Sequence, residues 1–199
     1  RIRGRRPKLR SGILLRCGNH PRYAYKIQYH EMAGNNQTLI DRTIRFAGAL
    51  ARHGLEISYY AHDYGWNVQK QFAAANVSIA KRSKGVGHYA LHTFNYLGSA
   101  WLETLAADIP TVCFYDPAIC EFRETAVPFI EKLRHVGILH ESPDSASDMV
   151  LEILSDPLKW WQSAEVQDAR LAFVKQYARL DDDWLDAWIE EFTQIANLG

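Results

Sequence analysis

Residues 90–115, ALHTFNYLGSAWLETLAADIPTVCFY, decide the fold of this chain because they contain a complete strand–helix–strand unit. The apolar runs at its two ends, 90–94 and 111–115, predict strands, and the stretch 99–107 between them predicts a helix. Two strands joined by a helix and short loops are typical of a parallel sheet, because a parallel pair requires a crossover connection.

The same alternation of short apolar runs and helical stretches continues on both sides of this unit. It predicts an α/β fold with a doubly wound, mainly parallel sheet of the Rossmann-like type, covered by helices on both faces. The further expected strands are 12–17, 23–29, 55–61, 77–80 and 138–140. The further expected helices are 38–53, 66–75, 122–136, 143–154, 157–162, 165–180 and 182–196.

The chain has 199 residues and a mass of 22.8 kDa, which is enough for one domain with a substantial core. We expect residues 1–11 to be a basic tail or linker and residues 12–142 to form the Rossmann-like domain. Residues 143–199 are expected to form an acidic helical extension packed on that domain. The first residue is Arg1 and not Met, from which we expect a processed or excised piece of a longer protein.

The charges are unevenly distributed although the formal net charge is zero. Residues 1–90 hold 16 Lys and Arg against 4 Asp and Glu, whereas residues 141–199 hold 4 against 13. Because an excess of positive charge raises the local concentration of phosphates, the front half is suited to an anionic ligand. Of the 16 cations, 6 lie within the first ten residues, so a solvated tail accounts for part of the excess.

Several classes of protein are excluded by the sequence. No apolar run reaches the length of a transmembrane helix, and the basic N-terminus lacks the apolar stretch of a secretory signal.

The three cysteines, Cys17, Cys113 and Cys120, lack CxxC spacing, which suits reduced thiols in the core of a cytoplasmic protein. A peripheral position at the inner face of the membrane stays open. His92 falls in a predicted strand and would not share a helical face with His88, so we predict no metal site.

Two loops follow predicted strands at their carboxyl ends, where open α/β sheets bind ligands. In the first loop, residues 61–66, His62 offers a hydrogen bond or a positive charge to a phosphate, and Asp63 is suited to cap the following helix. Both residues are equally ordinary in a loop without a ligand. We expect this loop to converge with the second one on a single anion pocket.

The second loop and the helix after it, residues 94–103, carry most of the candidate residues. Gly98 allows the backbone to approach a ligand closely, and Ser99 is expected as the N-cap at the positive end of the helix. Glu103 lies one turn further on the same face, where it can accept hydrogen bonds from a ribose. A Ser-capped helix after a strand is also common without any ligand. The candidate binding residues are His62, Asp63, Asn95, Tyr96, Gly98, Ser99 and Glu103.

The sequence assigns no catalytic residue. Neither loop contains the GxGxxG pattern of a dinucleotide site or the pattern of a P-loop, and no nucleophile-elbow sequence is present. The tryptophans of the C-terminal helices are interpreted as core between helices and not as a platform for bases. These are Trp160, Trp161, Trp184 and Trp188.

Residues 95–112, NYLGSAWLETLAADIPTV, resemble the loop–helix–strand at the donor-nucleotide site of GT-B glycosyltransferases, in the C-terminal half of that fold. More closely, residues 12–190 resemble the C-terminal portion of a transferase family encoded in surface-polysaccharide gene clusters. The further matching features are PRY at 21–23, HDYGW at 62–66, GILH at 137–140, WW at 160–161 and VQ at 166–167.

The resemblance implies roles for the candidate residues. Ser99 and the backbone near Gly98 would hold the donor phosphate, Glu103 would lie near the ribose, and His62 would face the nucleotide or the leaving phosphate. Here His62 is followed by Asp63, where sialyltransferase-like enzymes have a His-Pro pair.

The resemblance also implies the partners of the chain. The substrate would be a nucleotide-activated sugar, transferred by a metal-independent displacement at the anomeric carbon without a cofactor. The acceptor would be bound by an N-terminal domain of the full-length protein, so this chain would be the donor-binding half.

Two other classes of function stay open at this point. A non-catalytic α/β module that binds a partner protein would explain the acidic C-terminal helices and the lack of a visible nucleophile. Nucleic-acid binding through the basic front half ranks last, because no basic stretch interleaved with aromatic residues occurs outside residues 1–10. We therefore expect no nucleic-acid partner.

Overall fold

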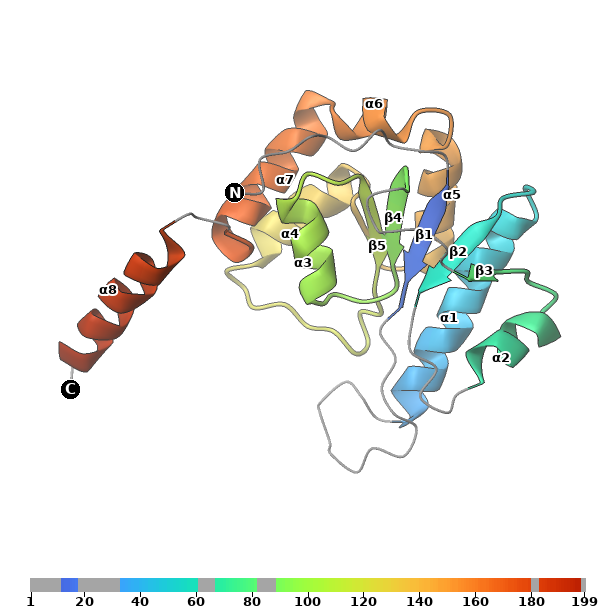
Figure 1. Cartoon of the computed structure of the whole chain (residues 1–199), viewed down its shortest axis with the longest axis horizontal. Helices are drawn as coiled ribbons and strands as arrows, with labels where there is room; N and C mark the ends of the chain where they lie inside the picture. The colour runs from blue at the N-terminus through green and yellow to red at the C-terminus, as the bar shows by residue number, and fades with distance from the viewer. Residues whose placement is uncertain (1–11, 18–32, 61–66, 82–88, 180–182, 198–199) are drawn as a thin grey trace.

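A computed structural model describes residues 12–17, 33–60, 67–81, 89–179 and 183–197 of the chain (Figure 1). Six parallel strands form one sheet in the order β3-β2-β1-β4-β5-β6, which confirms the predicted α/β fold with a mainly parallel sheet. The strands are β1 (Ile13–Arg16), β2 (Ile57–Tyr60), β3 (Ala80–Lys81), β4 (Leu91–Phe94), β5 (Thr111–Phe114) and β6 (Leu139–His140).

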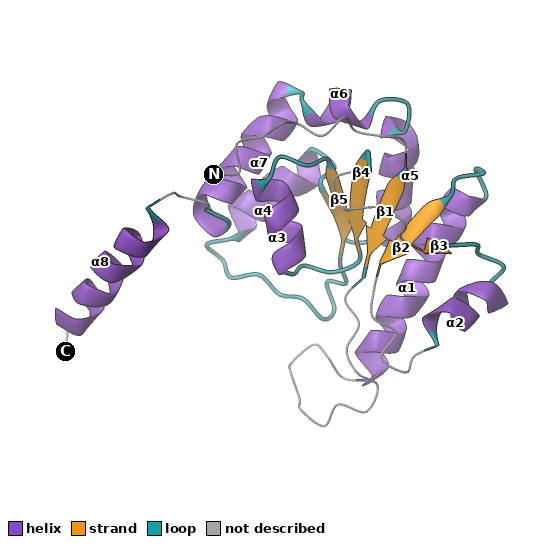
Figure 2. Ribbon diagram, in the orientation of Figure 1, coloured by secondary structure: helices purple, strands orange, loops and turns teal. Residues whose placement is uncertain are grey.

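Helices cover both faces of this sheet, as the doubly wound prediction requires (Figure 2). Helices α1 and α5 pack against each other on one face, while α3 and α4 both pack against α7 on the other. The helices are α1 (Ala33–Ala51), α2 (Val68–Ala74), α3 (Ser99–Ala106), α4 (Val127–His135), α5 (Pro143–Ile153), α6 (Pro157–Trp161), α7 (Ala164–Tyr177) and α8 (Trp184–Asn197).

The two faces of the sheet have separate cores because successive side chains of a strand point to opposite sides. In β5, Val112 and Phe114 belong to the core under α1 and α5, whereas Cys113 belongs to the core under α3, α4 and α7. All residues of β4 and β5 are buried, as is typical of central strands in a sheet covered on both faces.

The strand order changes direction beside β1, and this position decides where a ligand can bind. From β1 the chain proceeds outward to β2 and β3, and it then returns to place β4 on the other side of β1. The helices that follow β1 and β4 in the chain, α1 and α3, pack on opposite faces of the sheet. In open α/β sheets a ligand crevice is expected at such a position, at the carboxyl ends of the two strands.

Two predictions of elements differ from the structure, and a third is not tested by it. The helix expected over 122–136 begins only at Val127, because Pro128 lacks an N–H and is suited to the first turn of a helix. The strand expected over 77–80 is placed at Ala80–Lys81. The strand expected over 23–29 lies outside the described residues.

The interpretation of the tryptophans as inter-helix core is half correct. Trp161 is buried and Trp160 packs partly against both cores. Trp184 and Trp188, in contrast, are exposed on α8, and none of the residues of that helix is buried. Among the described residues, no helix is both long enough and apolar enough to cross a membrane.

Candidate functional site

The carboxyl ends of β1, β2 and β4 are connected to one another by backbone hydrogen bonds just beyond the strands. The amide of Cys17 donates to the carbonyl of Tyr60 at 3.1 Å, and the amide of Asn95 donates to the carbonyl of Arg16 at 3.4 Å. Cys17 therefore continues the pairing of β1 with β2, and Asn95 continues the pairing of β4 with β1. These contacts fix the floor of the crevice at the point where the strand order reverses.

Arg16, the last residue of β1, provides the positive charge at this crevice. Its guanidinium carbon lies 5.2 Å from the ring centroid of Phe94 at the end of β4 and 5.9 Å from that of Tyr60 at the end of β2. Both distances fall within the range of a cation–π contact. The side chain thus spans three adjacent strand ends, and it is half-buried, so the charge stays accessible to a ligand.

Tyr96 connects Arg16 to the second predicted loop. Burial raises the pKa of the Tyr96 hydroxyl, the positive charge of Arg16 acts to lower it, and the carboxylate of Glu103 acts to raise it. The Tyr96 hydroxyl therefore lies within electrostatic reach of both groups. Arg16 ends β1, Tyr96 follows the end of β4, and Glu103 lies on α3, the helix after it.

The start of α3 differs from the prediction for Ser99. The N-cap is Gly98 in an extended conformation, and the helix begins at Ser99, whose position is the first turn and not the cap. No side chain caps this end of α3, so the first N–H groups of the helix are not satisfied by a capping hydroxyl. The Ser99 side chain is exposed, as is that of Glu103 one turn further on the same helical face.

Gly98 is required here by a neighbouring ring and not by its backbone angles. A Cβ atom built on Gly98 would lie 2.3 Å from Cε2 of Tyr96 and 3.0 Å from Cδ2. The ring of Tyr96 thus occupies the space over Gly98 that the sequence predicted for a ligand. The Tyr96 ring also contacts the Phe94 ring edge-on, with 6.4 Å between the two ring centroids. Gly98 and Phe94 therefore both constrain the position of this ring.

Asn95 lies at the base of the crevice and connects the sheet to α1. Its side-chain amide donates to the hydroxyl of Thr43 at 2.8 Å, and that hydroxyl donates to the carbonyl of Leu39 at 2.6 Å. Asn95 is 1% exposed, so its amide faces α1 and not the open crevice. Its contacts with Thr43 and with the carbonyl of Arg16 give it a positioning role for the loop that carries Tyr96.

His62 and Asp63 lie outside the described residues, as does the whole of the loop 61–66. The strand before that loop, β2, ends at Tyr60 on the same edge of the sheet as β4, because all strands are parallel. Strand β1 lies between β2 and β4. The two predicted loops therefore follow strands that are next-nearest neighbours, and Arg16 occupies the strand end between them.

Two further arginines lie at the carboxyl ends of β5 and β6, and their charges are matched by acids. Arg42 of α1 donates to the carbonyls of Tyr115 at 2.6 Å and Glu141 at 2.7 Å, and it pairs with Asp116 at 3.7 Å. Arg134 of α4 pairs with Glu141 and also contacts the hydroxyl of Tyr115. This network connects α1 and α4 to the carboxyl ends of β5 and β6.

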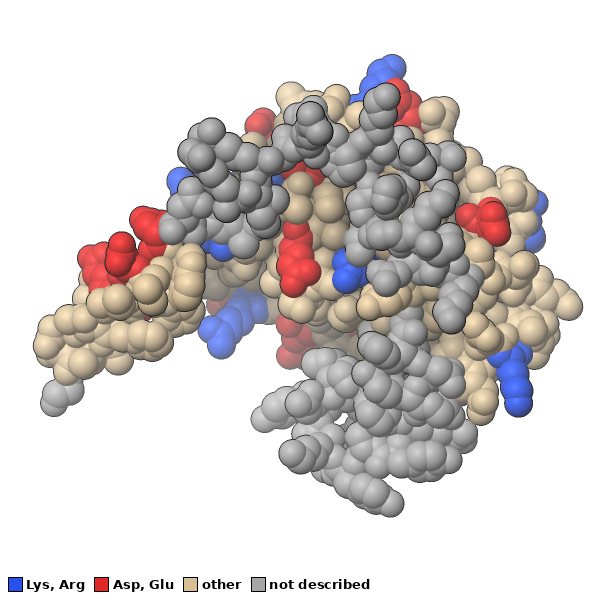
Figure 3. All heavy atoms as spheres, viewed as in Figure 1, with Lys and Arg blue, Asp and Glu red and all other residues tan. Residues whose placement is uncertain are grey.

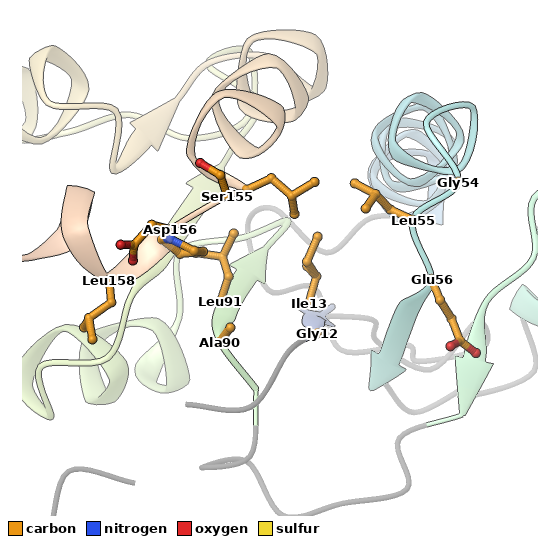
Figure 4. Close-up of a pocket in the computed structure, with 12 residues that line it drawn as sticks. Gly12, Ile13, Gly54, Leu55, Glu56, Ala90, Leu91, Ser155, Asp156 and Leu158 are labelled. Atoms are coloured by element: carbon orange, nitrogen blue, oxygen red, sulfur yellow. The ribbon is translucent and has the colours of Figure 1, made fainter. Parts of the chain in front are cut away.

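A hollow of about 600 Å³ lies at the opposite edge of the sheet, around the amino ends of β1, β2 and β4 (Figure 4). Its walls are mostly apolar, with Leu55, Leu91 and Leu158 among them. The carboxylate of Asp156 is already used as the N-cap of α6, where it accepts from the amide of Lys159. Parallel sheets bind ligands at their carboxyl edge, so we assign the candidate site to the crevice beside Arg16.

Arg16 was not among the residues selected from the sequence. The available signal was its place as the first cation after the apolar run of β1, at the exact end of a strand. Its importance depends on which strands flank β1, and that information is not local. Within the described ranges, no group of three or more His, Cys, Asp or Glu side chains is arranged to hold a metal ion.

Comparison with known proteins places the chain among transferases. The model of the LIC12162 family transferase matches residues 2–192, which is nearly the whole chain. Among curated proteins, nothing matches the sequence. Because the family model covers almost every residue, the chain belongs to the LIC12162 transferase family.

Proposed function

We propose that this chain is the nucleotide-sugar-binding half of a glycosyltransferase-like transferase that acts in cell-surface polysaccharide synthesis. Membership of a transferase family supports the group-transfer chemistry. The observation that carries the proposal is the position of Arg16 between Tyr60 and Phe94, at the strand-order reversal and within electrostatic reach of Tyr96.

The chemical parts of a nucleotide sugar match the groups at this edge of the sheet. Its phosphates carry negative charge, which the guanidinium of Arg16 and the uncapped N-terminus of α3 favour. Its ribose hydroxyls are donors that the exposed carboxylate of Glu103 can accept. His62 and Asp63 are proposed to approach the same ligand from the loop after β2.

The proposed reaction is a displacement at the anomeric carbon of the sugar. The bond from this carbon to the phosphate oxygen breaks, a bond to the acceptor hydroxyl oxygen forms, and the acceptor proton passes to a base. The charge that develops on the leaving phosphate is stabilised by Arg16, His62 and the start of α3. We assign the acceptor site and the base to a preceding domain of the full-length enzyme.

Calorimetric titration of the chain with UDP, GDP, CDP and CMP tests the proposal. We expect one of these nucleotides to bind, and Arg16→Gln to weaken that binding about ten- to hundredfold, since a hydrogen bond to a charged group contributes about 1.5–3 kcal/mol. Arg52→Gln is the matched control, because Arg52 is exposed just after the end of α1, away from the carboxyl edge of the sheet. Absence of binding by all four nucleotides to the folded chain would contradict the proposal.

Variants at the start of α3 separate this function from that of a protein-interaction module. We expect Glu103→Gln to weaken nucleotide binding, and Ser99→Ala to weaken it less because its hydroxyl does not cap the helix. If these variants leave nucleotide binding unchanged but abolish capture of a protein partner, the interaction module is the correct function.

A further inference from the structure

Helix α8 exposes an unusually large apolar surface. Its six large apolar side chains are all more than half exposed, from Leu185 at 54% to Trp184 at 61%. None of the residues of α8 is buried, and Figure 1 shows the helix extending away from the α/β body. Exposed apolar patches of this kind mark interaction sites in soluble proteins. The six residues are Trp184, Leu185, Trp188, Ile189, Phe192 and Ile195.

These side chains share one face of the helix, and acidic residues border it. At 3.6 residues per turn, the six positions fall within an arc of about 140°. Glu191 lies about 20° outside one end of this arc and Asp186 about 60° outside the other, while Glu190 lies near the centre of the polar face. Residues 183–197 contain four acidic residues and neither Lys nor Arg. Figure 3 shows the acidic side chains of α8 gathered on one side of the helix.

A complementary groove lies on the α3–α4–α7 face of the same molecule. It has a volume of about 830 Å³, and Phe129, Leu171 and Val174 are among its apolar walls. Leu171 is 51% exposed, which leaves an apolar side chain of α7 open to a partner. Lys175 and Arg179, both cationic and both from the end of α7 or just beyond it, complete the lining.

The groove and the apolar face of α8 meet at Arg179. This residue lines the groove and also a second hollow of about 290 Å³ against Trp184, Trp188 and Glu191 of α8. The two surfaces are therefore adjacent, and their apolar and charged parts are complementary. One is an apolar helix face with an acidic border, and the other is an apolar groove with a basic border.

We propose that this chain forms a two-fold dimer in which α8 of each copy occupies the α3–α4–α7 groove of the other copy. The two-fold arrangement covers both exposed surfaces of both molecules with a single kind of contact. Complementary charge selects the occupant: Glu191 at the edge of α8 is brought toward Lys175 on the groove. A membrane surface fits less well, because helices that lie on membranes are rich in Lys and Arg on their polar face.

Sedimentation velocity of the 199-residue chain at several concentrations tests this proposal. We expect a species of twice the 22.8 kDa chain mass. Trp188→Glu with Phe192→Glu, and separately Leu171→Glu, should each weaken the dimer roughly thirtyfold or more, as loss of a buried interface anchor does. Gln194→Glu is the matched control, because it adds the same charge to the polar face of α8.

Charge reversal tests the orientation of the contact. Glu191→Lys and Lys175→Glu should each weaken the dimer roughly two- to fivefold per pair, and the combined variant should restore it. Glu190→Lys makes the same charge change one residue away, on the polar face, and should have a smaller effect than Glu191→Lys. Equal effects of the two substitutions would contradict the proposed edge contact.

Three results would overturn the proposal. The first is a monomer at every concentration, and the second is a dimer that survives both the α8 and the Leu171 variants. The third is a monomer that binds vesicles of mixed neutral and anionic lipids through α8. Circular dichroism of each variant confirms that the α/β body is folded, so a loss of dimer reports on the interface.

Discussion

The ring of Tyr96 explains why residue 98 is a glycine. Gly98 has an extended backbone that any residue can adopt, so its requirement comes from the Tyr96 ring. We expect Gly98→Ala to cost about 1–3 kcal/mol of unfolding free energy, as overpacking does.

The same substitution in a Tyr96→Ala background should cost much less, because the ring that blocks the Cβ atom is gone. Urea unfolding of the two single variants and the double variant measures this coupling. Equal costs in the two backgrounds would show that Gly98 is required for another reason.

The thiols of the core provide a second prediction for single residues. Burial raises the pKa of Cys17 to about 12, and burial also raises the pKa of Cys113 well above its ordinary value. Because the thiolate is the reactive form, both should resist alkylation by iodoacetamide at pH 8 in the folded chain. Cys120 is only half-buried and should react first.

Mass spectrometry of the labelled chain gives the order of reaction. In urea all three cysteines should react at similar rates, which is the control for access. Faster labelling of Cys17 than of Cys120 in the folded chain would contradict the prediction.

Helices α5 and α3 each begin with a serine in the cap or the first turn, and the structure gives these two serines different roles. Ser142 is the N-cap of α5, and its hydroxyl accepts from the amide of Ser145 at 3.1 Å. Ser99 makes no such contact at the start of α3. We expect Ser142→Ala to lower the unfolding free energy by about 1 kcal/mol, and Ser99→Ala by less than about 0.5 kcal/mol. Thermal and urea unfolding measure both, and similar losses would contradict the assignment of Gly98 as the cap.

His140 at the end of β6 makes the stability depend on pH. Burial lowers the pKa of His140, although the Gly137 carbonyl, 3.0 Å from its ring, acts to raise it. The unfolded chain therefore binds a proton more readily than the folded one, so this contribution is present above the unfolded pKa of about 6.5 and declines as the pH falls below it.

His140→Gln should make the stability less dependent on pH between about 7.5 and 5.5 than that of the unchanged protein. Urea unfolding at a series of pH values measures the difference. His135→Gln, at an exposed position of α4, is the matched control. An unchanged slope in the His140 variant would contradict the prediction.

At the scale of the whole molecule, α6 and α7 are attached to the α3–β5 connection by a polar cluster. Arg170 of α7 is 6% exposed, donates to the carbonyl of Leu105 at 2.8 Å and pairs with Asp108 at 3.3 Å. The indole N–H of Trp161 donates to the same Asp108 carboxylate at 2.9 Å. The C-terminal helices are thus held by directional contacts in addition to their apolar packing.

Arg170→Met should destabilise the whole chain by about 2–4 kcal/mol, because it removes the side-chain donor to the buried Leu105 carbonyl and leaves Asp108 without its cation. Urea unfolding should show one cooperative transition, shifted to lower denaturant. Lys159→Met changes an exposed cation of the neighbouring helix α6 and provides the control.

The local pattern of the sequence was sufficient for the type of nearly every described element. The run from Leu91 to Phe94 and the helix from Ser99 were predicted to within one residue, because a buried strand and an amphipathic helix have distinct apolar periods. The predicted boundary was wrong where a local signal was ambiguous, as at Pro128 in the first turn of α4. The prediction that Trp184 and Trp188 are buried was wrong. An apolar helical face indicates that the helix packs against a partner, but it does not identify that partner.

By itself, the sequence determined an α/β chain with parallel strands and an acidic C-terminal helix, and it singled out the loop before α3 as a candidate site. Only the tertiary structure decided that β1 lies between β2 and β4, and so that Arg16 meets Tyr60 and Phe94. The physical reason is the range of the forces involved. Periodicity and turn chemistry act over a few residues, whereas the choice of strand neighbours depends on the packing of segments that are distant in the chain.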